Sequence, residues 1–276
     1  MAKKYWTGAT NGVLTTATNF QGGVALVDGD ELWLTQLAVR SITSALTLAG
    51  VALAKVVATR GFLHSLGGVG NELEPENGIG EFRWEATGED SEAHIDTEID
   101  FGYINTSSKK GLGVILHGTA AGDEETAMHF VDGLITLDAN YNFVNASIIR
   151  MDGGRLVIPS GVTLGTGNRI LQNGGRIESA QTIINYRGRG GELYLSGTAA
   201  ATLIDLCGEA GLVTLASTGT IAEAHVDAGV LDSRTFDLAR TITSLYGGGT
   251  GRALLGHDTT VTSAVQGNGW RPEYPV

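Results

Sequence analysis

The fold of this chain is decided by segments such as Gly191-Glu192-Leu193-Tyr194-Leu195, in which a glycine opens a short run of alternating side chains. The same arrangement occurs in Gly154-Arg155-Leu156-Val157-Ile158 and in Gly211-Leu212-Val213-Thr214-Leu215. Because side chains alternate between the two sides of a β-strand, the residues two and four positions after each glycine are predicted to face a common interior.

The opening glycine recurs at similar intervals along the chain, as Gly113, Gly133, Gly154, Gly175, Gly191, Gly211 and Gly229. The aliphatic residues two positions later form a predicted inward ladder of Ile115, Ile135, Leu156, Ile177, Leu193, Val213 and Leu231. A repeat this short cannot enclose a core of its own, so successive repeats must stack on one another. A second apolar cluster precedes most of the glycines, so each repeat offers at least two strands.

These features predict an all-β fold, a single-stranded parallel β-helix that is right-handed and has about 20 residues per coil. Leucine-rich repeats have a similar length, but their L-x-x-L-x-L and asparagine pattern is absent from the sequence. A left-handed hexapeptide helix would need a six-residue period, which the sequence also lacks.

The sequence also predicts how the other segments of the chain are placed relative to this β-helix. Residues 1–45 are predicted to form an N-terminal β cap and docking segment, because an uncapped solenoid would expose its core and an edge strand. Residues 46–262 are the predicted β-helix, with coils beginning near residue 31. Residues 72–100 hold eleven acidic residues and one basic residue and are predicted to be an acidic insertion. Residues 263–276 form a predicted extended tail that contains two prolines.

The composition argues against several classes of protein. A formal charge of −12 over 276 residues argues against a nucleic-acid partner, because phosphate contacts need a basic surface. The single cysteine, Cys207, excludes an intramolecular disulfide framework. The most apolar stretch is too short and too mixed to span a bilayer, and the first six residues lack the apolar region of a secretory signal. We therefore expect a soluble protein made in a cytoplasm, without a membrane partner.

Three alternating carboxylates of the acidic segment, Asp96, Glu98 and Asp100, would share one side of a strand. Such a cluster is suited to Ca²⁺ or to the carboxylate pair of a glycoside hydrolase. The segment has no EF-hand spacing, so a solvated acidic surface is the favoured interpretation.

Other candidate chemical groups are isolated in the sequence. The histidines His94, His117, His129, His225 and His257 are scattered one by one. A zinc site would require that coil stacking bring distant ones together. The glycine-rich stretch 247–252 lacks the Lys-Ser/Thr ending of a phosphate loop, and no serine lies in a G-x-S-x-G elbow. We therefore predict no catalytic, cofactor-binding or metal-binding residues.

The opening residues carry a resemblance to a known group. Tyr5-Trp6-Thr7-Gly8-Ala9-Thr10, followed by Ala17-Thr18-Asn19-Phe20 and Gly29-Asp30, looks like the start of structural proteins of tailed bacteriophages. The predicted coils likewise resemble the β-helical virion proteins of these phages, which include tailspikes and capsid decoration or cement proteins. The resemblance implies a homotrimer, a location in the virion and a non-enzymatic role. It also implies binding to the major capsid protein or another virion protein.

The expected function is that of a capsid-decorating structural protein. The alternative is a tailspike-like or lyase-like β-helix that binds or cleaves polysaccharide. For the trimer we expect an outward apolar stripe that includes Val114, Leu212 and Val230. For docking we expect the chain ends to supply aromatic and cationic side chains. These residues are Lys3, Lys4, Tyr5, Trp6, Trp270, Arg271 and Tyr274.

Overall fold

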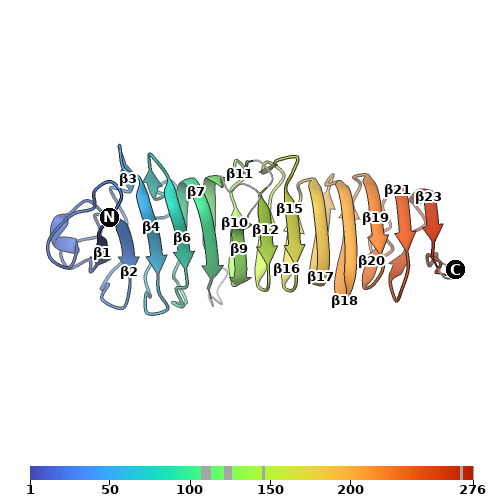
Figure 1. Cartoon of the computed structure of the whole chain (residues 1–276), viewed down its shortest axis with the longest axis horizontal. Coiled ribbons are helices and arrows are strands. Elements are labelled where there is room, and N and C mark those ends of the chain that lie inside the picture. Colours follow the sequence, from blue (N-terminus) through green and yellow to red (C-terminus); the bar gives the residue numbers. More distant parts are fainter. Residues whose placement is uncertain (107–112, 121–125, 145–146, 268–269, 276) are drawn as a thin grey trace.

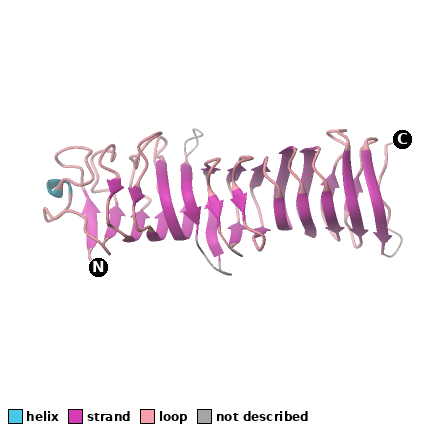
Figure 2. Cartoon of the chain, turned by 90° about the horizontal axis from the view of Figure 1, so that it is seen from above, coloured by secondary structure: helices cyan, strands magenta, loops and turns pink. Residues whose placement is uncertain are grey.

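The protein is an elongated parallel β-helix, shown here by a computed structural model that describes all residues except 107–112, 121–125, 145–146, 268–269 and 276. The strands stack along the long axis, with the N-terminus at one end and the C-terminus at the other (Figures 1 and 2). One 3-10 helix, η1 (Ala17–Asn19), lies near the N-terminal end. Within the described part of the chain, no helix is long and apolar enough to cross a membrane.

The strands are β1 (Lys3–Trp6), β2 (Glu31–Leu34), β3 (Thr47–Leu48), β4 (Leu53–Ala58), β5 (Glu74–Pro75), β6 (Ile79–Trp84), β7 (Ala93–Asn105), β8 (Val114–Ala120), β9 (Thr126–Asp132), β10 (Leu134–Leu137), β11 (Asn142–Phe143), β12 (Ile148–Met151), β13 (Arg155–Ile158), β14 (Thr163–Leu164), β15 (Arg169–Gln172), β16 (Arg176–Ser179), β17 (Ile183–Gly197), β18 (Ala201–Ser217), β19 (Ile221–Val226), β20 (Val230–Asp232), β21 (Arg240–Gly247), β22 (Arg252–Leu254) and β23 (Thr259–Gln266).

Each coil contributes to up to three faces, which we name face 1, face 2 and face 3. Face 1 is the longest ladder, of thirteen parallel strands: β1, β2, β4, β6, β7, β9, β12, β15, β17, β18, β19, β21 and β23. Face 2 pairs β8, β10, β13, β16, β20 and β22 with the other halves of β7, β17 and β18. Among the described residues, face 3 contains only short pairs such as β11 with β14. The long strands β7, β17 and β18 therefore bend from one face to the next.

The core is a set of buried ladders inside these faces. On face 2 the described pairings connect the inward residues Ala93, Val114, Ile135, Leu156, Ile177, Leu193, Val213, Leu231 and Ala253. All nine are fully buried. Full burial of one aliphatic side chain contributes about 1.5–3 kcal/mol, so the ladder is a major source of stability.

The first predicted member of this ladder is wrong. Ile135 pairs with Val114, and Val114 is fully buried, whereas Ile115 pairs with Thr136 and is half-buried on the outer side. The other glycine-led segments keep the spacing of two, but here the inward residue directly follows Gly113. Side-chain direction is set by pairing with the next coil, and a shift of one residue reverses it. Val114 therefore cannot belong to an outward stripe.

The acidic segment 72–100 is not an insertion. Its strand β6 pairs in parallel with β4 and β7, and β7 continues the ladder to β8 and β9. The acidic residues alternate with buried ones such as Phe82 and Ile95, so they occupy outward positions of ordinary coils. The charges are concentrated here without interrupting the period-two pattern.

The N-terminal residues form the first coil as well as a cap. β1 already pairs in parallel with β2, so the stacked coils begin at residue 3 and not near residue 31. Asn19 is buried, and its amide oxygen accepts hydrogen bonds from the backbone N–H groups of Thr10 and Asn11. The backbone N–H of Gln21 donates to the carbonyl oxygen of Tyr5. The segment between β1 and β2 thus covers part of the edge that β1 would expose.

The predicted C-terminal tail, residues 263–276, begins within the last strand and continues against the body. β23 runs to Gln266 as the last strand of face 1. Beyond it, Glu273 pairs with Leu254, and the backbone N–H of Leu255 donates to the carbonyl oxygen of Glu273 over 2.9 Å. The tail therefore packs on the last coil. Residues 268, 269 and 276 of the predicted tail lie outside the described residues.

Candidate functional site

The predicted docking residues at the N-terminal end differ in their exposure. Trp6 is fully buried, and its indole nitrogen donates to the carbonyl oxygen of Arg40, so it fills the first coil and is not available for docking. The ammonium of Lys4 lies 3.7 Å from the buried carboxylate of Asp30. Lys3 lies over the ring of Trp33 at 4.5 Å and Tyr5 contacts the same ring, so these two residues sit on the outer surface of face 1.

At the C-terminal end, Trp270 is likewise not available for docking. Trp270 is buried, because its ring covers Gly247 and its indole nitrogen donates to the carbonyl oxygen of Gly251. Arg271 and Tyr274 are exposed. Of the seven predicted docking residues, the two tryptophans are therefore structural.

The three alternating carboxylates Asp96, Glu98 and Asp100 are all exposed. They do not form one cluster. Asp96 and Glu98 line a cavity of about 560 Å³ together with Glu74, whereas Glu98 and Asp100 line a neighbouring, smaller cavity. Partial desolvation of its carboxyl raises the pKa of Asp96. The nearby His117 lowers that pKa, and the carboxylates around it raise it further.

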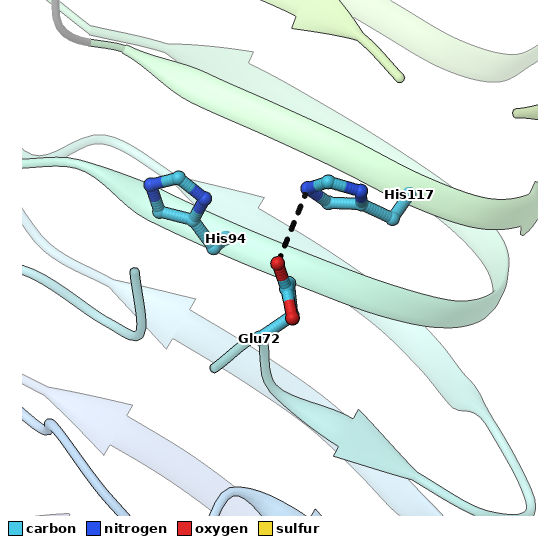
Figure 3. Close-up of side chains that lie close together, drawn as sticks. All are labelled: Glu72, His94 and His117. Atoms are coloured by element: carbon cyan, nitrogen blue, oxygen red, sulfur yellow. Dashed lines mark ion pairs between the residues drawn. The ribbon is translucent and has the colours of Figure 1, made fainter. Parts of the chain in front are cut away.

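The structure brings together two histidines that stand apart in the sequence. Ligand atoms of Glu72, His94 and His117 all lie within 4.8 Å of one another. Glu72 precedes the short stretch that bridges to β7, His94 is in β7, and His117 is in β8, so the three side chains come from neighbouring coils (Figure 3). The Nε2 atom of His117 lies 3.9 Å from Oε1 of Glu72. The two imidazole rings lie nearly parallel, with centroids 6.3 Å apart.

Carboxylates surround this cluster, which we call the Glu–His–His cluster. Asp138 Oδ1 lies 3.6 Å from Nδ1 of His117, and Glu92 Oε2 lies 3.3 Å from Nε2 of His94. His94 is only 1% exposed, yet among the described residues neither of its ring nitrogens has a hydrogen-bond partner. The Nε2 atom of His117 is also buried without a partner. Buried polar atoms normally have hydrogen-bond partners, so three such imidazole nitrogens in one place are unusual.

A second feature follows the outer side of face 1 from end to end. Pairing between coils aligns one outward residue from each strand, and we call this set the aromatic–arginine row. It contains Tyr5, Trp33, Val57, Arg83, Tyr103, His129, Arg150, Leu171, Arg187, Asp205, His225, Tyr246 and Val265. Neighbours in the row contact each other: Arg83 lies 5.1 Å from the ring of Tyr103, and the rings of His225 and Tyr246 are 4.6 Å apart.

Three arginines converge near the middle of this row. Arg150, Arg187 and Arg189 line a cavity of about 180 Å³ together with Leu171 and Asn173. Arg150 is paired with Asp152, and Arg187 with Asp205. The cavity is a local concentration of guanidinium groups in a chain that is acidic overall.

Face 2 does not carry the apolar stripe expected from the sequence. Its outward row contains Leu212 and Val230 next to each other, but Glu192 lies on one side of this pair and Arg252 on the other. Arg176 pairs with Glu192 at 2.8 Å. Face 2 is thus covered in part by ion pairs.

The comparisons with known proteins identify no relative. No family model, curated protein or solved structure matches this chain.

The sequence has no linear motif for the Glu–His–His cluster or for the aromatic–arginine row. His94 and His117 are separated by about one coil of sequence, and Glu72 precedes His94 by a similar interval, so only the coil length could have suggested that they meet. The aromatic–arginine row could have been found by aligning the second apolar cluster of each repeat and reading the alternate positions.

Proposed function

We propose that this protein is a structural, non-enzymatic component of a virion, a rigid rod that assembles as a homotrimer and decorates the head of a tailed phage. The resemblance of the opening residues supports the setting in a virion. The observation that carries the structural role is the aromatic–arginine row, which follows one face of the rod over its whole length.

The composition of this row is typical of a protein interface. Tyrosine, tryptophan and arginine are enriched at interfaces and dominate their binding energy. The row presents Trp33, Tyr103 and Tyr246 on outward, half-buried positions, and Val265 is exposed at its end. The regular spacing of the strands, about 4.8 Å, lets a second identical rod align with it over many coils.

In a closed trimer with three-fold symmetry, every copy makes the same contacts. In a cyclic trimer each chain uses two different patches, one toward each neighbour, and no unpaired patch remains. Face 1 supplies one of these patches, whereas the apolar members of the face 2 row, Leu212 and Val230, are only two neighbours between charged residues and form no second stripe. We therefore place the trimer contact along face 1 and its margins.

The test of self-assembly is the mass in solution. Light scattering should give about three times the chain mass of 28.7 kDa. Replacing Trp33, Tyr103 and Tyr246 together by serine should yield monomers that keep the β-rich circular dichroism spectrum. A matched variant on face 2, Leu212→Ser with Val230→Ser, should remain trimeric. A monomeric parent protein, or dissociation caused only by the face 2 variant, would contradict the proposal.

Docking to the capsid is assigned to the residues at the chain ends that lie on the outer surface. Lys3 and Tyr5 lie at one end, and Arg271 and Tyr274 at the other. Binding of purified protein to undecorated capsids should weaken at least tenfold for Arg271→Ser with Tyr274→Ser or for Lys3→Ser with Tyr5→Ser. If both double variants bind with unchanged affinity, docking must lie elsewhere on the rod.

The arginine cavity favours a second candidate function, the binding of an acidic polysaccharide. Guanidinium groups pair well with sugar carboxylates, and Leu171 adds an apolar surface beside them. Calorimetry with polygalacturonate should detect binding that is lost in Arg187→Gln with Arg189→Gln and kept in Arg155→Gln, whose arginine pairs with Glu178 on face 2. Release of reducing ends during such an incubation would indicate an enzyme.

A further inference from the structure

We propose that Glu72, His94 and His117 form a binding site for a divalent transition metal of the Zn²⁺ type. The site does not depend on the structural role proposed above. Two independent observations support the metal site. Three ligand atoms converge within 4.8 Å of one another, and among the described residues His94 is buried with both ring nitrogens unpartnered. A bound cation would satisfy the atoms that the protein itself leaves without a partner.

The ligand types select the class of metal. Imidazole nitrogens with one carboxylate suit Zn²⁺ and its first-row neighbours, whereas Ca²⁺ and Mg²⁺ prefer oxygen ligands alone. Metal–nitrogen bonds of about 2.0–2.1 Å in a tetrahedral site place ligand atoms roughly 3.4 Å apart. The observed separation of 3.9 Å between Glu72 and His117, and separations of up to 4.8 Å within the cluster, shorten toward this value when a metal binds.

A carboxylate lies beside the ring nitrogen of each histidine that faces away from the cluster. Asp138 lies beside Nδ1 of His117 and leaves its Nε2 turned toward Glu72. Glu92 lies beside Nε2 of His94, which leaves Nδ1 as the coordinating nitrogen. The backbone N–H of Gly70 donates to Oε1 of Glu72 over 2.7 Å. Carboxylates that accept from the second nitrogen of a ligating histidine are the usual outer partners of protein metal sites.

Three protein ligands leave one position of a tetrahedral site open to water or to a group from a partner. The metal would also join three successive coils. Bound Zn²⁺ is therefore expected to stabilise this part of the β-helix, because a ligand that binds only the folded state raises its stability.

The experiment is a titration of the chelator-treated, full-length protein with Zn²⁺ alone, followed by calorimetry and by thermal unfolding. We expect one Zn²⁺ per chain and a rise in the unfolding temperature. His117→Ala and Glu72→Gln should weaken binding by more than about 100-fold, and Asp138→Asn by about 10-fold or more. His257→Ala, which changes an exposed histidine outside the cluster, should bind like the parent.

Two further measurements keep the assignment testable if His94→Ala fails to fold. The visible spectrum of bound Co²⁺ should report nitrogen ligation in the parent and change in His117→Ala. A titration with Ca²⁺ should show binding at least 100-fold weaker than that of Zn²⁺. Absence of Zn²⁺ binding by the folded parent would overturn the proposal. Unchanged binding by folded His117→Ala, or a preference for Ca²⁺, would overturn it as well.

Discussion

The indole Nε1 of Trp270 donates a hydrogen bond to the carbonyl oxygen of Gly251 over 2.6 Å, and the ring occupies the space that a side chain at Gly247 would need. This contact joins the C-terminal tail to the last coil. The guanidinium of Arg252 adds two hydrogen bonds to the carboxylate of Glu273, at 2.8 and 3.0 Å. The tail thus covers one end of the core.

Replacing Trp270 by alanine should destabilise the protein by about 3–5 kcal/mol, the usual cost of removing a large buried aromatic ring. Urea unfolding followed by circular dichroism measures this loss. Tyr274→Ala, on the exposed part of the same tail, should change stability by less than about 0.5 kcal/mol. Equal effects of the two variants would show that the tail does not close the core.

Replacing Leu156 by alanine should cost about 2–5 kcal/mol, because Leu156 is fully buried between Ile135 and Ile177 in the face 2 ladder. Val157 points outward on the same strand and is half-buried, so Val157→Ala should cost about 1 kcal/mol or less. Chemical denaturation of both variants gives the comparison. A larger loss for Val157→Ala would mean that the strand faces the other way.

Replacing Gly175 by alanine should destabilise the coil in two ways. Its φ of 72° is in the left-handed region, which costs a residue with a side chain roughly 1–2 kcal/mol. The new Cβ would also lie 2.5 Å from the carbonyl oxygen of Gly154, one coil away. Gly197 has φ of 62° but open space around it, so Gly197→Ala should show the first cost alone. Thermal unfolding should therefore rank Gly175→Ala as the less stable variant.

Replacing Asp152 by asparagine should have an effect that depends on pH. Burial acts to raise the pKa of Asp152, but hydrogen bonds from Asn173, His129 and Arg150 outweigh it and lower the pKa to about 2. A lowered pKa in the folded state stabilises the protein above the unfolded value near 4, and this contribution disappears as the pH falls toward 2.

The parent should exceed Asp152→Asn in stability by roughly 1–2 kcal/mol at pH 7, a value reduced for the partial exposure of the carboxylate. The difference should shrink between pH 4 and pH 2. Urea titrations of both proteins at several pH values measure it. A difference that stays constant over this range would exclude the charged carboxylate as its source.

Replacing Arg240 by methionine should loosen the loop before β21. The buried guanidinium donates to the carbonyl oxygens of Leu215, Phe236 and Leu238, and its removal leaves these acceptors without their donor. Unsatisfied buried groups cost about 1–3 kcal/mol. Limited proteolysis should cut residues 233–239 faster in the variant. An unchanged cleavage rate would show that the loop is held by other contacts.

The sequence alone determined the fold class, because the recurrence of the opening glycine and the alternation within each strand are local properties of the chain. Ile135, Leu156 and Leu193 are inward in the structure as their spacing from a glycine predicts. The same spacing failed at Ile115, where pairing with β10 turns Val114 inward. The direction of a side chain there depends on the neighbouring coil, which the spacing does not describe.

Only the tertiary structure decided which outward residues meet. The Glu–His–His cluster forms because stacked coils place residues that stand a full coil apart in the sequence within a few ångströms of each other. The aromatic–arginine row arises in the same way, from one residue in each coil. The burial of Trp6 and Trp270 was also decided at this level, because it depends on how the chain ends fold over the core. Local sequence sets the alternation of side chains within each strand, but pairing between coils of varying length sets their direction and the register that brings distant residues together.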